Sequence, residues 1–482
     1  MRAKVIIKYL GYVLLFNALL MYISAAISLF LKETSMVPLM YSAIVCTIIG
    51  IFPQIFIEKI GEISFHEGMS ITVFGWLLTC MVGAIPYFMW GGEFTFVNAV
   101  FESVAGFTTT GSTILTDIEI LPKGLLFWRS ATHFIGGMGI ILFVLLILPN
   151  SQGVRSSIYR TEVSGLSMLN FHMQPRQIAK IIAFIYIGLI LLETILLWVL
   201  GMTFFDAICH SFATLATGGF STKNNSIAFY DSIWIELTIS FFMLMGGMHF
   251  GLIYATIRRE KLNIFTSKVV RSYFLVIGVG IILVALKLTS DHVYGWSEAL
   301  RHAYFQVISL VTTTGFATVD TSTWPIFTIF ILIYFSIQCA LVGSTTGGIK
   351  FDRIYLFFKT LGNQIKQIIH PNAVFVTKVN STTISEKMEY QSVVYIVFYM
   401  IILLLSSLIL STINIDGVTS FTASVATLGT VGPGFGDSIG SLGNYSAIPT
   451  AGKYILSVNM LLGRLEIMNI LALFVILSSK KS

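Results

Sequence analysis

The chain has 482 residues, of which 55% are hydrophobic and only 11% are charged. Soluble domains carry about 25% charged residues, so this composition excludes a set of soluble domains and indicates a polytopic membrane protein. The formal net charge is +6, and the four cysteines lie in apolar stretches without metal-binding spacing. These cysteines are therefore expected to be buried small side chains and not a disulfide framework.

A helix crosses the bilayer core with about 20 apolar residues. Ten stretches fit this length, at 9–31, 37–57, 70–91, 126–148, 181–201, 237–257, 272–290, 324–342, 391–411 and 454–478. The first is longer than the apolar region of a signal peptide, which is about 7–15 residues, so we expect a membrane anchor there. The longest polar connection, 358–390, joins two spans, and no soluble domain is expected.

Basic residues are unevenly divided between the two sides of these spans. With the N-terminus inside, 21 of the 29 Lys and Arg residues fall on the inner side, seven on the outer side and Arg464 within the last span. Acidic residues favour the outer side, which leaves a net charge of −5 outside and +13 inside. Both termini are therefore expected to be cytoplasmic. An acidic outer vestibule would concentrate cations at its mouth.

Four outer segments share one pattern, an amphipathic stretch of about 12–16 residues that ends in a Thr/Gly cluster. The stretches and their clusters are 94–107 with 108–113, 204–215 with 216–222, 296–311 with 312–318, and 415–428 with 429–436. Their central glycines, Gly111, Gly219, Gly315 and Gly432, are spaced by 108, 96 and 117 residues. This repeat predicts an all-α membrane protein with four fused span–pore helix–span units around a central pore, after two extra N-terminal helices.

The spacing also divides the chain into five parts. We expect an N-terminal transmembrane helix pair at 1–69, followed by pore repeats at 70–176, 177–271, 272–389 and 390–482, with a broken second span in the third repeat.

The repeated unit supplies a particular chemistry. Irregular backbone at membrane depth is tolerated only where it is buried in protein or lines a water-filled cavity. Glycine lets successive carbonyls turn toward an axis, and four such loops form a ring of oxygens that can replace the water shell of a cation. Three acids, Asp206, Glu298 and Asp416, fall at or near the starts of the short helices, where they suit capping and the helix dipole. Helix packing in lipid could explain one such cluster, but hardly four.

Two features lie in the second spans. Residues 343–350 read GSTTGGIK, which would weaken a helix in the membrane; a loose turn at a cytoplasmic helix end is the alternative. Arg464 interrupts the apolar run 455–477, where a charge normally faces a cavity or a partner. A structural pair with Glu466, Glu193 or Glu236 remains open for Arg464.

Together these residues resemble the Trk/Ktr/HKT superfamily of potassium transporters, over essentially the whole chain. The leading helix pair makes the chain more similar to bacterial Trk uptake subunits than to Ktr relatives. The resemblance implies a potassium-selective uptake protein of the bacterial inner membrane, with K⁺ as the transported ion, no cofactor and no enzymatic activity. Glycine at all four central positions implies a preference for potassium over sodium.

The resemblance also implies which residues form the site. A metal-binding K⁺ filter of backbone carbonyls would comprise Thr109, Thr110, Gly111, Thr217, Gly218, Gly219, Thr313, Thr314, Gly315, Thr430, Val431 and Gly432. A gate below it would comprise an intramembrane loop and a pore arginine: Gly343, Ser344, Thr345, Thr346, Gly347, Gly348 and Arg464. Gly218 departs from the pattern, since the other three loops have threonine or valine at this position.

As partners the resemblance implies the lipid bilayer, a second copy in a homodimer and a TrkA-like cytosolic nucleotide-binding regulatory subunit, with no nucleic acid. The alternative function is a secondary ion-coupled solute transporter. Such folds normally use inverted repeats and midplane sites, whereas these four repeats enter in the same sense. A membrane enzyme is disfavoured, because the sequence has no nucleophile–base set, metal cluster or nucleotide motif.

Overall fold

In the computed structural model, the chain is described at residues 2–58, 63–139, 175–380, 382–436, 439–468 and 470–471. This part is mostly helical, and its one sheet pairs the short antiparallel strands β1 (Lys378–Val379) and β2 (Thr382–Thr383). The expected all-α polytopic fold is confirmed.

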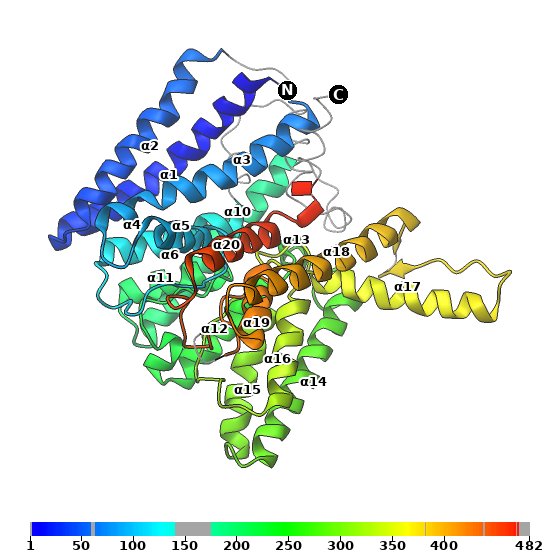
Figure 1. The fold of residues 1–482 in the computed structure, drawn as a ribbon. Coiled ribbons are helices and arrows are strands. Elements are labelled where there is room, and N and C mark those ends of the chain that lie inside the picture. The colour runs from blue at the N-terminus through cyan, green and yellow to red at the C-terminus, as the bar shows by residue number, and fades with distance from the viewer. Residues whose placement is uncertain are drawn as a thin grey trace.

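A helical hairpin opens the chain and lies at the edge of the bundle (Figure 1). Helices α1 (Ala3–Leu31) and α2 (Met36–Phe56) approach closely at Gly11 and Gly50. A Cβ atom at Gly11 would lie 2.7 Å from the carbonyl oxygen of Gly50, and one at Gly50 would lie 2.9 Å from that of Gly11. Small residues let membrane helices pack backbone to backbone, and this crossing depends on both glycines.

After the hairpin, one order of elements recurs four times: a long helix, a short helix, an irregular outer loop and another helix. The first repeat contains α3 (Phe65–Gly83), α4 (Ile85–Trp90), α5 (Phe96–Phe107) and α6 (Lys123–Met138), and the second contains α10 (Pro175–Val199), α11 (Phe204–Leu215), the 3₁₀ helix η1 (Ser226–Tyr230), α12 (Ile233–Gly246) and α13 (Phe250–Ile257). The third contains α14 (Lys268–Ser290), α15 (Trp296–Val311), α16 (Ile326–Gln338) and α17 (Phe351–Ile369). The fourth contains α18 (Glu386–Ser411), α19 (Gly417–Leu428) and α20 (Thr450–Arg464). The predicted boundaries of the five parts remain predictions.

The ten predicted spans are only partly continuous. Six helical segments in the described part are long and apolar enough to cross a membrane, and α12 with α13 forms a seventh that is bent by 101°. The other three predictions fall on α6, α16 and α20, whose 16, 13 and 15 residues are shorter than a span needs. Residues 140–148 and 472–478 of the predicted spans lie outside the described part.

Of the predicted spans, 237–257 and 454–478 are interrupted in the structure, and the helix of 324–342 ends at Gln338, ahead of the break expected in the third repeat. The physical reason is the approach of each second helix to the end of its own short helix. A Cβ atom at Gly136, Gly246 or Gly463 would lie 3.0 Å or less from the carbonyl oxygen of the last residue of α5, α11 or α19. In the third repeat, α16 ends where Cys339 takes a φ of 58°. Tertiary contact interrupts these helices where the apolar sequence would continue them.

We expect Gly50→Leu to loosen the α1–α2 hairpin, because overpacking a tight contact costs about 1–3 kcal/mol. The matched control is Gly278→Leu in α14, where no described atom lies within 4 Å of an added Cβ. Thermal unfolding of the purified protein in detergent measures both variants. Only Gly50→Leu should lower the unfolding temperature, and equal shifts would contradict the packing role.

Candidate functional site

The four short helices, α5, α11, α15 and α19, begin at outer loops, and each has a side-chain N-cap or an acidic residue in its first turn. Thr95 and Thr203 cap α5 and α11. Asp416 caps α19 by accepting a hydrogen bond from the backbone amide three residues on, at 2.9 Å. Hydrogen bonds from Thr419 hold the pKa of the Asp416 carboxyl below its ordinary value. Asp206 and Glu298 lie in the first turns of α11 and α15, as predicted.

The loops that follow these helices share one backbone path. We number them loop 1 (108–113), loop 2 (216–222), loop 3 (312–318) and loop 4 (429–436). In each, a threonine takes a left-handed φ of 53–56° and a glycine two residues later takes a φ of 76–98°: Thr109 and Gly111, Thr217 and Gly219, Thr313 and Gly315, Thr430 and Gly432. A positive φ is uncommon for threonine, so four occurrences in register show that the loops are structurally equivalent.

Each loop is fixed to its own short helix. The residue between the threonine and the glycine donates its amide to a carbonyl five residues earlier, at 2.8–2.9 Å: Thr110 to Ala105, Gly218 to Ala213, Thr314 to Ser309, and Val431 to Ala426. These bonds over-determine the strained threonine conformation, which lets it persist.

The four loops close into a ring. A Cβ atom on each central glycine would lie under 3.0 Å from a carbonyl oxygen of the next loop: Gly111 from Gly218, Gly219 from Thr314, Gly315 from Val431, and Gly432 from Thr110. Since the fourth loop returns to the first, the order around the ring is 1–2–3–4. The structure thus brings together all twelve residues that sequence analysis proposed for the filter, and no side chain fits at the four glycines.

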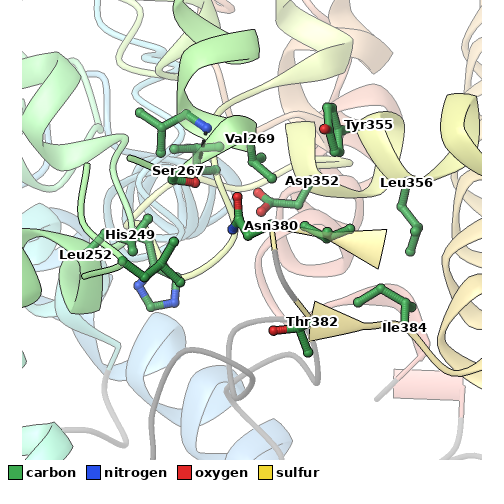
Figure 2. A pocket seen from close by; sticks show the side chains of 14 residues that line it. His249, Leu252, Ser267, Val269, Asp352, Tyr355, Leu356, Asn380, Thr382 and Ile384 are labelled. Atoms are coloured by element: carbon green, nitrogen blue, oxygen red, sulfur yellow. Dashed lines mark hydrogen bonds between the residues drawn. The ribbon is translucent and has the colours of Figure 1, made fainter. Parts of the chain in front are cut away.

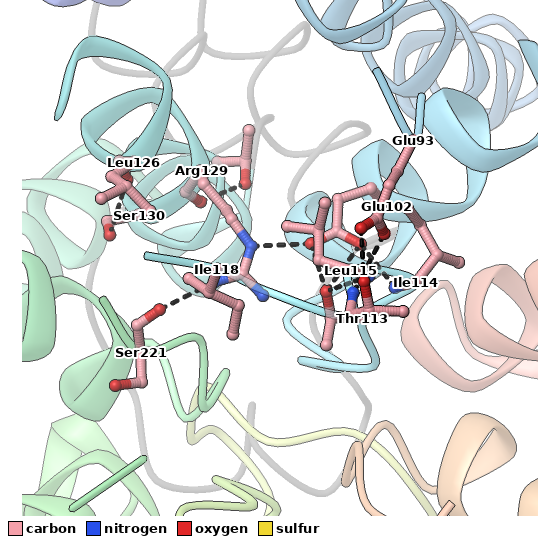
Figure 3. Close-up of polar contacts among 12 residues, drawn as sticks. Glu93, Glu102, Thr113, Ile114, Leu115, Ile118, Leu126, Arg129, Ser130 and Ser221 are labelled. Carbon is pink, nitrogen blue, oxygen red and sulfur yellow. Dashed lines mark hydrogen bonds and ion pairs between the residues drawn. The ribbon is translucent and has the colours of Figure 1, made fainter. Parts of the chain in front are cut away.

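A buried ion pair supports the ring at loops 1 and 2 (Figure 3). Arg129 of α6 is 2% exposed and Glu102 of α5 is 0% exposed, with Nε and Oε1 2.6 Å apart. Glu102 also accepts hydrogen bonds from the Thr113 hydroxyl at 2.9 Å and the Ile114 amide at 3.0 Å. Arg129 donates to the carbonyl of Ser221 in loop 2 at 2.9 Å. The pair therefore joins two neighbouring loops.

This pair is not evident from the charge pattern, in which Glu102 and Arg129 fall among the charges of the outer face. The available signal was a carboxylate inside a short apolar helix, nine residues before the central glycine. His210 holds the same position in the second repeat and contacts the Ser221 hydroxyl at 3.0 Å. Gln306 holds it in the third and donates to the carbonyl of Val319 at 3.4 Å.

A cavity of about 300 Å³ opens on the outer-loop side of the ring, lined by all four central glycines. Its described lining includes Arg129 and Lys223, along with hydroxyl and amide groups, but no carboxylate. The expected acidic vestibule is therefore absent from this part of the described mouth. The nearby acids are engaged elsewhere: Glu102 binds Arg129, and Asp117 accepts a hydrogen bond from Asn224 at 2.8 Å.

On the other side of the ring, an irregular segment crosses from loop 2 to loop 4. The Thr345 hydroxyl lies 3.2 Å from that of Thr217 in loop 2, and the Thr345 amide donates to the carbonyl of Gly246 at 3.2 Å. A Cβ atom at Gly347 would clash with the hydroxyl of Thr430 in loop 4. Residues 343–348 therefore contact two opposite members of the ring, loop 2 and loop 4.

Arg464 is the last residue of α20 and reaches this segment. Its guanidinium donates to the carbonyl of Thr345 and to those of Gly136 and Gly137 at the end of α6. Glu466 is instead paired with Arg353 at 2.9 Å, and Glu236 with Arg301 at 2.7 Å. Arg464 thus ties the segment beneath the ring to the first repeat.

A smaller cavity of about 50 Å³ is lined by residues of α13, α14, α17 and the two-stranded sheet, and by Leu341, just before this segment (Figure 2). Asp352, at the start of α17, accepts a hydrogen bond from the amide of Val342 at 2.7 Å. Asn380, in the turn of the sheet, accepts one from the amide of Lys268 at 2.8 Å. Asp352, which holds Val342 just before the segment, therefore lines the same cavity as residues of the sheet.

Short helices that bring four backbone loops together inside a bundle of apolar, membrane-length helices are typical of a membrane transport protein. Residues 39–482 match the family described as TrkH, cation transport protein, and the chain belongs to this family. It is a transport protein and not an enzyme. The resemblance expected from the sequence is confirmed.

The chain is 36% identical over 421 residues to the Trk system potassium uptake protein TrkH of Escherichia coli (strain K12), covering 86% of each chain. It is 30% identical over 483 residues to that of Vibrio parahaemolyticus, covering 98% of each. The crystal structure of the potassium transporter TrkH from Vibrio parahaemolyticus matches with a TM-score of 0.88 and 29% identity, over 98% of both chains.

We expect Arg129→Leu to destabilise the protein, because removing one member of a buried pair costs about 3–5 kcal/mol. The control is Arg301→Leu, whose arginine is 26% exposed and loses a partly solvated pair. Thermal unfolding should show a large loss for Arg129→Leu and a smaller one for Arg301→Leu. The double variant Glu102→Leu/Arg129→Leu should recover part of the loss, and no recovery would contradict the pairing argument.

Proposed function

We propose that this chain is a potassium-selective uptake subunit that passes K⁺ down its electrochemical gradient through the ring of loops 1 to 4. The closed order of glycines and carbonyls around that ring carries the proposal. Its relatives named above are described as potassium uptake proteins, which supports K⁺ as the ion.

In this proposal, carbonyl oxygens of the twelve filter residues replace the water shell of the ion. The short helices end at the ring, so the negative ends of their dipoles favour a cation there. The amide bonds to each short helix and the contacts between loops restrain the carbonyls. Such restraint favours one ion size, because the ring cannot contract freely around a smaller ion.

Residues 343–348 and Arg464 form the gate in this proposal. The segment crosses beneath the ring from loop 2 to loop 4, and Arg464 donates to Thr345 in its middle. The guanidinium also places a positive charge where K⁺ would leave the ring. Movement of the segment would have to break the hydrogen bonds of Arg464, so the two parts act as one obstruction.

Regulation would come from the cytoplasmic side. We place both termini in the cytoplasm of a bacterial inner membrane, and we assign a homodimer and a TrkA-like nucleotide-binding partner. The net charge of +13 on the predicted inner face offers a docking surface. Asp352 accepts a hydrogen bond from Val342, next to the gate segment, and lines the same cavity as the sheet, which offers a route from that surface to the gate.

The test is the reversal potential of the protein reconstituted in lipid bilayers with a K⁺ gradient and no other solute. It should follow the K⁺ equilibrium potential. Gly111→Ser should lower the K⁺/Na⁺ permeability ratio about tenfold or more, which corresponds to about 1.4 kcal/mol, because its side chain displaces the carbonyl of Gly218.

The matched control is Gly201→Ser, since Gly201 has a φ of 108° but no described atom within 4 Å of an added Cβ. This control should keep the ratio. A current that requires a second solute would instead favour a secondary ion-coupled transporter, and an unchanged ratio for Gly111→Ser would remove loop 1 from the filter.

Arg464→Ala should raise K⁺ flux per assembled protein. At about 8 Å and an effective dielectric of about 20, the repulsion of K⁺ by the guanidinium is roughly 2 kcal/mol, or roughly 30-fold in crossing rate. Arg464→Lys should change the flux much less, since it keeps the charge. Flux measurements on protein checked for correct assembly decide this, and loss of assembly in the alanine variant would indicate a structural role.

A further inference from the structure

Loop 2 differs from the other loops at one position. Gly218 stands where they have Thr110, Thr314 and Val431. Unlike the central glycines, Gly218 does not have a positive φ. Its backbone conformation is therefore open to any residue, and the reason for glycine must lie in the space around it.

The imidazole of His133 occupies that space. A Cβ atom at Gly218 would lie 2.5 Å from Nδ1 of His133 and 2.6 Å from its Cγ and Cε1. His133 belongs to α6 of the first repeat, so this contact joins two repeats. The ring is 0% exposed and stacks on Phe220 of loop 2, with centroids 4.2 Å apart and planes at 21°.

One face of α6 follows the whole of loop 2. Arg129 donates to the carbonyl of Ser221, His133 meets Gly218, and a Cβ atom at Gly137 would lie 2.6 Å from Cα of Ala216. These three residues are four apart, which places them in a row on the helix. His133 is the central member of this row.

The other three loops have a side chain at the position of Gly218: Thr110, Thr314 and Val431. In loops 1 and 3, the threonine hydroxyl pairs with one two residues earlier: Thr110 with Thr108 at 2.8 Å and Thr314 with Thr312 at 2.9 Å. Loop 4 has Gly429 and Val431 at these positions, and loop 2 has Ala216 and Gly218. Loop 2 has no side chain at this position, and the imidazole of His133, from another repeat, lies there.

We infer that His133 is a positioning residue that sets cation selectivity by holding the carbonyl of Gly218 in the ring. The inference rests on the proposed function. Gly218 is the residue whose carbonyl faces Gly111 of loop 1. The contact of His133 with Gly218 therefore restrains the carbonyl that joins loop 2 to Gly111 of loop 1.

The test exchanges volume between the two positions. His133→Ala leaves a void behind loop 2, and Gly218→Val forces a side chain against the imidazole. Each should lower the K⁺/Na⁺ permeability ratio about tenfold. In the double variant His133→Ala/Gly218→Val, loop 2 has a small residue followed two positions later by valine, as loop 4 does with Gly429 and Val431. Its K⁺/Na⁺ permeability ratio should return to within about threefold of the original ratio. Ratios are measured on correctly assembled protein, so that folding losses do not enter.

The control is Gly219→Ala, which strikes the carbonyl of Thr314 and should lower the ratio with or without His133→Ala. If Gly219→Ala lowers the ratio but the double variant is no better than the single ones, the role of His133 is overturned and the filter stands. If Gly219→Ala leaves the ratio unchanged, the proposed filter itself fails.

Discussion

Close contact between the backbones of neighbouring loops is the constraint on which the rest of this structure depends. Each central glycine faces a carbonyl of the next loop at a distance that excludes any side chain. That contact requires a positive φ at four glycines and at four threonines, which in turn requires helices that end at the ring and anchor each loop by its amides. The second helices must also approach the ends of the short helices, and glycines at 136, 246 and 463 permit this.

Charge inside the bundle serves the same purpose. Isolated ions are costly to bury, and they are retained only when paired and hydrogen-bonded. Glu102 accepts a hydrogen bond from the Ile114 amide, next to loop 1, and Arg129 donates to the Ser221 carbonyl in loop 2. The ion pair of Arg353 and Glu466 joins the start of α17 to the chain beyond α20. Each pair fixes elements that are distant in sequence. Arg464 differs, since its donors reach backbone carbonyls of the segment beneath the ring and of α6.

Sequence patterns predicted what is local and repeated. Four Thr/Gly clusters at similar spacing placed the loops, and the glycines of 343–348 located the irregular segment, since both depend on backbone preferences written in a few adjacent residues. The order of loops around the ring, the breaks in α12–α13 and α20, and the burial of Arg129 depend on contacts between repeats. The sequence shows that Gly218 departs from the threonine or valine of the other loops, but only the position of His133 in the folded chain explains the glycine.

The backbone of the ring and its positive-φ threonines repeat four times, whereas the residues on either side of each threonine differ between loops. Loops 1 and 3 have threonine pairs behind the ring, while loops 2 and 4 have a small residue two positions before Gly218 or Val431. The segment 343–348 contacts loops 2 and 4 at Thr217 and Thr430. A single segment that contacts these two loops breaks the fourfold equivalence of the ring. Fusing the repeats in one chain permits this difference, because each loop can then be matched to its own neighbours while the backbone ring stays intact.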